Sequence, residues 1–197
     1  MKKELDYFNI GYSYGGNQEW FNTFFMKIGG CAAETAIELC IYLDKYRNTK
    51  LCPFDADNIT KKDYIRFGDI MKPYLHPRFQ GIDTLSIYTE GFGKYLRDVK
   101  GSVKFDTVEG TEDYSKAEKM IIKSIDNALP VAFLMLNNKN RKYKDYFWHW
   151  FIINGYNKTD NDLLVKAVNY STFEWLSLSE LWNSGYERRG GIVSISL

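Results

Sequence analysis

The sequence has few of the residues that build disulfide frameworks and metal sites. Its 197 residues include only 3 cysteines and 2 histidines, and no Cys-X-X-Cys pair occurs. We therefore expect no structural zinc site. Cys31 and Cys40 fall on opposite faces of one predicted helix and cannot pair with each other. A bond from Cys40 to Cys52 is conceivable across the following loop, but reduced thiols in a cytoplasm are the simpler expectation.

Long apolar runs and a strong net charge are missing as well. No stretch approaches the roughly 18 apolar residues that span a membrane. No apolar run follows Lys2 and Lys3, so we expect no signal peptide either. The 26 basic and 25 acidic residues leave a net charge of +1. This near balance argues against nucleic acid or an acidic membrane surface as the main partner. We expect a cytoplasmic protein.

The sequence is instead rich in core-forming residues, with 45% hydrophobic and 17% aromatic residues. A chain of this length buries a substantial core, and we expect one domain over residues 1–197. Helical spacing followed by short apolar runs predicts an α+β fold with an antiparallel sheet. The predicted helices cover 31–45, 60–72, the second half of 84–99, 115–127 and 178–182, and the predicted strands cover 129–136, 147–156, 163–169 and 191–197. Residues 46–112 are predicted to form a mostly helical insertion with one strand at 102–105.

The stretch 28–43 has the strongest pattern in the chain. From Cys31 onward it is rich in alanine and leucine and free of glycine and proline, which predicts a helix. Glu34 and Glu38 leave only a narrow polar stripe, so we expect a core helix. Two glycines precede Cys31, where the chain can turn sharply. A thiol at a helix N-terminus meets free N–H groups and the helix dipole, which lower its pKa and make it a better nucleophile.

His149 and Asn169 are the other candidate catalytic residues. His149 lies in the apolar strand predicted over 147–156, and Asn169 ends the strand predicted over 163–169. In a hairpin centred near Thr159 the two residues face each other (159−149 = 10; 169−159 = 10). Directly opposite side chains lie about 5 Å apart at Cβ. An asparagine there can accept from one imidazole nitrogen and leave the other facing a nucleophile.

A helix-opening cysteine followed by histidine and asparagine on adjacent strands resembles the papain-like cysteine peptidases, in the same order. The chain looks most like the bacterial branch related to the leader-peptide peptidases that process bacteriocins at double-glycine sites. The resemblance is carried by Gly30-Cys31-Ala32-Ala33, by the strand from His149 to Gly155-Tyr156, and by Asn169. It covers the first and last thirds of the chain and leaves 46–112 unmatched. The string Cys-Gly-Ser-Cys-Trp is absent, so the chain is no close relative of the cathepsins.

The resemblance implies a papain-like fold and a Cys-His-Asn triad. Cys31 would be the nucleophile, His149 the general base and acid, and Asn169 the residue that orients the imidazole. The implied oxyanion hole pairs the N–H of the cysteine with a glutamine side chain, for which Gln18 is the best match, 13 residues upstream (31−18 = 13). Asn17 and Asn22 are rivals for that role.

The implied reaction hydrolyses a peptide or a small amide through a thioester, with no cofactor and no metal. Two alternatives stay open at this point. An acyltransferase on the same triad would pass the acyl group to an amine, and a non-catalytic module of the same fold would bind peptides or a partner protein. Each residue also has a plain structural reading: Cys31 as core packing, Asn169 as the cap of a strand end, and Gln18 as a loop residue.

Overall fold

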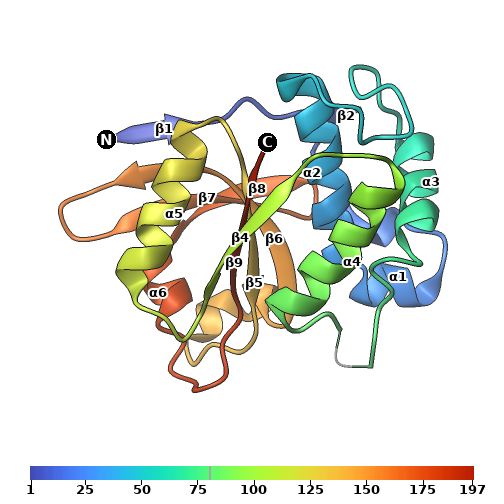
Figure 1. Cartoon of the computed structure of the whole chain (residues 1–197). Coiled ribbons are helices and arrows are strands. Elements are labelled where there is room, and N and C mark those ends of the chain that lie inside the picture. The colour runs from blue at the N-terminus through green and yellow to red at the C-terminus, as the bar shows by residue number, and fades with distance from the viewer. Residues whose placement is uncertain (80) are drawn as a thin grey trace.

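The computed structural model describes residues 1–79 and 81–197 and is built around one antiparallel sheet (Figure 1). Every pairing in this sheet is antiparallel. In order across the sheet, its strands are β4 (Lys104–Glu109), β9 (Gly191–Ser196), β5 (Val131–Met135), β6 (His149–Lys158), β7 (Leu163–Asn169) and β8 (Thr172–Ser177). The short β1 (Lys2–Glu4) pairs with the far end of β6, and β2 (Asn9–Ile10) forms a small hairpin with β3 (Ser13–Tyr14).

Helices flank the sheet on two sides. They are α1 (Phe24–Gly29), α2 (Cys31–Arg47), α3 (Lys61–Met71), α4 (Leu85–Asp98), α5 (Tyr114–Asp126) and α6 (Leu178–Trp182), with two 3-10 turns, η1 (Gln18–Trp20) and η2 (Arg141–Tyr146). In Figure 1 α1 to α4 gather on one side of the sheet, whereas α5 and α6 lie on the other. This arrangement confirms the mixed α+β class expected from the sequence. Among the described residues no helix is long and apolar enough to cross a membrane.

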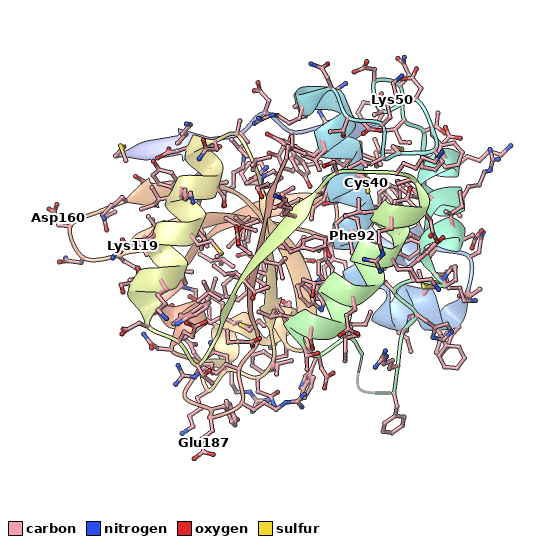
Figure 2. The ribbon with its side chains drawn as sticks, viewed as in Figure 1. Cys40, Lys50, Phe92, Lys119, Asp160 and Glu187 are labelled. Atoms are coloured by element: carbon pink, nitrogen blue, oxygen red, sulfur yellow. The ribbon has the colours of Figure 1, made fainter. Side chains whose placement is uncertain are left out.

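Helix α2 is the core element that the sequence predicts. All of its residues from Cys31 to Leu43 are buried, including both glutamates. Gly30 precedes it because a Cβ at that position would lie 2.3 Å from the carbonyl oxygen of Met26. Figure 2 shows Cys40 on α2 and Phe92 on the neighbouring α4, whereas Lys50, Lys119, Asp160 and Glu187 lie at the periphery.

Residues 46–112 contribute to the same core as the rest of the chain. Helix α3 begins at Thr60 with the capping box predicted by Thr60 and Asp63, and it packs against α2. Gly68 of α3 lets the Phe21 ring pack against the helix, since a Cβ there would lie 2.4 Å from that ring. The segment ends in β4, which pairs with β9 at the edge of the central sheet. The strand therefore begins at Lys104, two residues later than predicted, and runs on to Glu109.

The β6–β7 hairpin differs in register from the symmetric one assumed above. Ile152 pairs with Val168, so extending this register by one residue puts Asn169 opposite Phe151 (152−1 = 151; 168+1 = 169). An irregularity between Ile153 and Tyr156 shifts the pairing further along the hairpin. Asn169 is thus displaced by two residues from the position directly opposite His149. A shift of two leaves a side chain on the same face of the sheet, so the pair can still meet.

The turn from β7 to β8 has an unusual backbone. Asn169 pairs with Thr172, and the two residues between them, Tyr170 and Ser171, have φ angles of 46° and 65°. Tight hairpin turns with two positive φ angles normally use asparagine, aspartate or glycine. A bulky tyrosine in this conformation is strained, and such strain is often found beside functional sites.

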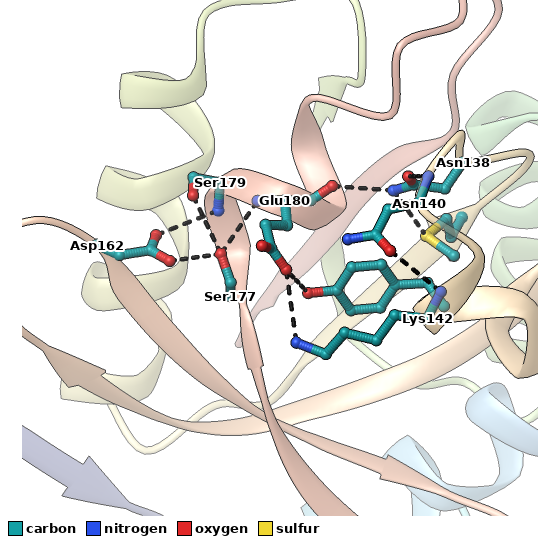
Figure 3. A network of polar contacts seen from close by, with 9 residues as sticks. Asn138, Asn140, Lys142, Asp162, Ser177, Ser179 and Glu180 are labelled. Atoms are coloured by element: carbon teal, nitrogen blue, oxygen red, sulfur yellow. Dashed lines mark hydrogen bonds and ion pairs between the residues drawn. The ribbon is translucent and has the colours of Figure 1, made fainter.

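The other end of this hairpin is held by polar contacts (Figure 3). Asp162 accepts hydrogen bonds from the hydroxyl of Ser177 and from the backbone N–H of Ser179. Ser177 in turn caps α6 by accepting from the N–H of Glu180. The carboxylate of Glu180 pairs with Lys142 at 3.5 Å. These contacts fix α6 and η2 against the hairpin that carries Asn169.

Candidate active site

Cys31 lies at the first position of α2 and is nearly covered, with 6% of its surface exposed. Its sulfur lies beside backbone N–H groups of Trp150, Ala32 and Cys31 itself, each of which lowers the pKa of the thiol. Trp150 directly follows His149 in β6, and α2 packs against this strand. The structure therefore brings the predicted nucleophile next to the strand that carries the predicted base.

The protonation state of Cys31 differs from the sequence-based expectation. The pKa of the thiol is raised from 9.0 to about 11, mainly by burial and to a smaller extent by Glu34 on the same helix. The helix N-terminus and the three N–H groups act in the opposite direction, but desolvation is the larger effect. The expectation of a lowered pKa was wrong because the sequence did not reveal how fully the sulfur is covered. At neutral pH the resting side chain is a thiol.

His149 and Asn169 form a direct hydrogen bond. The Nε2 atom of His149 lies 2.7 Å from Oδ1 of Asn169. A carbonyl oxygen only accepts, so Nε2 carries the proton and Nδ1 keeps its lone pair. The imidazole is 5% exposed, and burial lowers its pKa from 6.5 to about 4, although the Asn169 contact raises it. His149 is therefore neutral at neutral pH, with Nδ1 available as a base.

Tyr170 covers this pair and was not singled out from the sequence. Its ring stacks on the imidazole of His149 at a centroid distance of 5.1 Å and an interplanar angle of 20°. The tyrosine hydroxyl is close enough to Cys31 and Glu34 for both to raise its pKa, which burial takes to about 12. In the sequence, the only indication that Tyr170 belongs to the site is its position directly after Asn169. The residue type does not indicate the positive φ angle at this position, because tyrosine is not a usual residue for such a turn.

The structure places Gln18 next to α2, in the turn η1. Its amide nitrogen donates to the carbonyl oxygen of Lys27 at 2.9 Å, which uses one of its two N–H groups. The amide oxygen is buried without a hydrogen-bond partner. The rivals Asn17 and Asn22 are engaged elsewhere: Asn17 accepts from the N–H of Glu19, and Asn22 donates to Asp69. Of these three candidates for an oxyanion donor, Gln18 is the most buried.

Two buried carboxyl groups lie one turn apart on α2, and sequence analysis had assigned them only to a polar stripe. Glu38 accepts from the hydroxyl of Tyr7 at 2.7 Å and from the N–H of Gly16 at 2.6 Å. Burial raises the pKa of Glu38 to about 7 and raises the pKa of Glu34 more, since Glu34 also faces the charge of Glu38. The buried hydroxyl of Tyr64 nearby has no hydrogen-bond partner. Glu34 is thus neutral at pH 7, and the contacts of Glu38 with Tyr7 and Gly16 join the N-terminal segment to the helix that begins with Cys31.

An apolar groove of about 790 Å³ opens beside Cys31. Phe25 and Ile28 of α1 form one wall, Trp148 forms another, and residues 76–79 complete the lining. Trp148 directly precedes His149 and has a φ angle of 55°, and its indole N–H donates to Asn137 at 2.9 Å. Exposed aromatic and aliphatic side chains that gather around a hollow commonly mark a binding site.

The described residues offer no arrangement of three or more His, Cys, Asp or Glu side chains that could hold a metal ion. His76, the second histidine, lines the groove and does not join the His149 pair. The sequence matches no known family model, and no curated protein is significantly similar to it.

Proposed function

We propose that the protein is a papain-like cysteine hydrolase that cleaves a peptide or another amide through Cys31, His149 and Asn169. The observation that supports this most is the 2.7 Å hydrogen bond between His149 and Asn169, because it sets the tautomer that a cysteine nucleophile needs. The position of Cys31 beside the backbone N–H of Trp150, one residue from His149, is the second support.

The pKa values favour general-base activation over a preformed ion pair. With the thiol pKa near 11 and the imidazole pKa near 4, both groups are neutral at rest. In the proposed reaction Nδ1 of His149 takes the thiol proton as the sulfur attacks the carbonyl carbon. The imidazolium then protonates the leaving amine, and a thioester remains on Cys31. Water attacks the thioester with His149 again as base, which releases the acid and restores the thiol.

The developing oxyanion would be stabilised by backbone N–H groups at the start of α2. The first N–H groups of a helix have no partner within the helix and lie at the positive end of its dipole. The Cys31 N–H is the first of these, and the remaining N–H of the Gln18 amide is the proposed second donor. The groove beside Cys31 suits a substrate with a bulky apolar group close to the attacked bond.

A non-catalytic peptide-binding module of the same fold is the second candidate, and the burial of Cys31 favours it. An enzyme of this class must admit a carbonyl carbon to within bonding distance of a sulfur that is 6% exposed in the resting structure. A binding module needs only the groove. An acyltransferase on the same triad is the third reading, and added amines would reveal it as amide products in place of acids.

The test is incubation of the purified chain with a mixed peptide library, read by mass spectrometry for new termini. We expect cleavage by the wild type and its loss in Cys31→Ser and His149→Ala. Cys52→Ala is the matched control, since it also removes a thiol but lies outside the site, and it should cleave normally. A peptidyl electrophile should modify Cys31 in the wild type and not in His149→Ala.

Peptide binding without cleavage, with an unmodified Cys31, would support the non-catalytic module. Equal cleavage by the wild type and Cys31→Ser would exclude the proposed nucleophile.

A further inference from the structure

A chain of polar side chains extends from His149 to the protein surface. After His149 and Asn169, the next member is Tyr146, whose hydroxyl lies close enough to the Asn169 side chain for the amide to act as a donor that lowers the pKa of the phenol. Tyr146 in turn donates to Oε1 of Glu174 at 2.6 Å. Tyr146 is buried and Glu174 is exposed, so the chain connects a buried imidazole to a solvated carboxylate.

The sheet explains why these residues meet. Glu174 of β8 pairs with Ala167 of β7, and cross-strand partners share a face of a sheet. Asn169 lies two residues after Ala167, so it shares that face with Glu174. The Tyr146 ring packs edge-on against Phe151 at 4.8 Å, and Phe151 is the residue opposite Asn169 in the register given above. The contact among the three polar groups therefore follows from the strand pairing.

The direction of every hydrogen bond in the chain is set by its exposed end. An ionised carboxylate only accepts, so the Tyr146 O–H points to Glu174. The Tyr146 oxygen then accepts from the amide nitrogen of Asn169, which turns the amide oxygen to His149. The imidazole must donate from Nε2, and Nδ1 is left as the base. If a donor replaced the carboxylate, the Tyr146 O–H would point to Asn169 and the amide nitrogen of Asn169 would face His149. Nδ1 of His149 would then carry the proton.

We propose that Tyr146 and Glu174 are positioning residues that fix the amide orientation of Asn169 and thereby the tautomer of His149. The proposal rests on the proposed function for its catalytic consequence, but the tautomer itself is a property of the resting protein. Neither residue touches the substrate, and both act through Asn169.

The tautomer is measured directly by ¹⁵N spectra of histidine-labelled protein at pH 7. The chain has only 2 histidines, and His76→Gln assigns the signals by difference. In the wild type we expect a protonated Nε2 and an unprotonated Nδ1 for His149. Tyr146→Phe removes the acceptor that holds the Asn169 amide, so the two tautomers should mix. The kcat for any cleaved peptide should fall about tenfold with KM unchanged, as expected for loss of one buried hydrogen bond.

Glu174 variants test the direction of the chain. Glu174→Gln still offers an acceptor to Tyr146 and should retain most of the wild-type tautomer. Glu174→Lys offers only donors, so it should reverse the chain and give a protonated Nδ1 on His149. A purely structural role for Glu174 predicts no difference between these two variants in the His149 spectrum. Because Glu174 is exposed, both variants should fold.

Tyr143→Phe is the matched control. Tyr143 lies in the same turn η2, is also buried, and donates to a different glutamate, Glu180, which pairs with Lys142 (Figure 3). Its loss should leave the His149 spectrum unchanged. An unchanged His149 tautomer in both Tyr146→Phe and Glu174→Lys would overturn the proposal, with or without hydrolysis. A shifted tautomer in a protein that cleaves nothing would uphold the positioning chain and reject the proposed function.

Discussion

The Tyr170 ring lies nearly parallel to the imidazole of His149, with 5.1 Å between the two ring centroids. This stacking removes one face of the imidazole from water, and it places the base in a dry environment. Removing an imidazole from water destabilises its charged form and so lowers its pKa. The pKa of His149 is accordingly lowered to about 4, even though the Asn169 hydrogen bond acts in the other direction.

Replacing Tyr170 with asparagine should therefore raise the pKa of His149 toward 6.5. Asparagine accepts the positive φ angle of 46° more readily than tyrosine, so the turn should form without added strain. The imidazole would lose its cover and gain hydration. The measurement is an NMR titration of the His149 ring signals, with His76 in the same sample as internal reference. A His149 pKa that stays near 4 would show that burial by other groups is sufficient.

Alkylation of Cys31 should be slow at neutral pH and accelerate through pH 9 and beyond. A thiol with a pKa near 11 is almost wholly protonated at pH 7, and only the thiolate reacts. Iodoacetamide labelling followed by peptide mass spectrometry gives the rate at each pH for each cysteine. Fast labelling of Cys31 near pH 6 would contradict the neutral pair and restore the lowered thiol pKa that the helix terminus alone predicts.

Asn169→Ala should lower turnover about tenfold and leave the fold intact, provided that the chain cleaves a peptide. The substitution removes the acceptor of the Nε2 proton, so the imidazole is free to rotate and to change its tautomer, but both reacting groups stay in place. The kcat and the unfolding midpoint of the variant should be measured together. Full activity in Asn169→Ala would show that another group orients His149.

Glu38→Gln should make stability less dependent on pH. The pKa of Glu38 is raised from 4.5 to about 7, so the folded state holds a proton that the unfolded chain releases. The contribution of Glu38 to the free energy of unfolding is therefore greatest below pH 4.5, and it falls as the pH rises to 7. The difference between the two pKa values corresponds to about 3 kcal/mol, which is an upper limit for the effect.

Glutamine cannot ionise, and its amide oxygen can still accept from Gly16. Urea unfolding at pH 5 and pH 8 should show that the variant gains stability relative to the wild type at the higher pH. A pH dependence equal to that of the wild type would mean that Glu38 is ionised in the folded state throughout this range.

Much of the fold could be predicted from periodicity and capping signals. The capping-box pattern of Thr60 and Asp63 predicts the start of α3. The predicted helix 178–182 matches α6. Strands β5, β6, β7 and β9 appear within two residues of the predicted bounds, because each is an apolar run between polar turns. The strand β8 was missed, since only Leu176 among its residues is buried and it has no buried apolar run.

The predicted site residues came from residue type and order, and the structure joins His149 to Asn169 although the assumed register was wrong. The error of two residues kept both side chains on one face, and a shift of one would have separated them. The pKa of Cys31 could not be predicted, because it depends on burial in the folded protein and on groups distant in sequence, such as the backbone N–H of Trp150, which lowers it. The proximity of Tyr146 and Glu174 to Asn169 could not be predicted either, since only the strand register brings these residues together.

Strand β6, which begins with His149, is paired along its length with β5, β7 and β1. In such a strand backbone amides exchange with solvent only when the sheet opens, which is the rarest fluctuation of a domain. The groove wall from α1 is a six-residue helix with exposed Phe24, Phe25 and Ile28, whose side chains have few packing constraints. Evolution can therefore alter what the groove accepts by changing α1 while the imidazole and its partners keep their geometry.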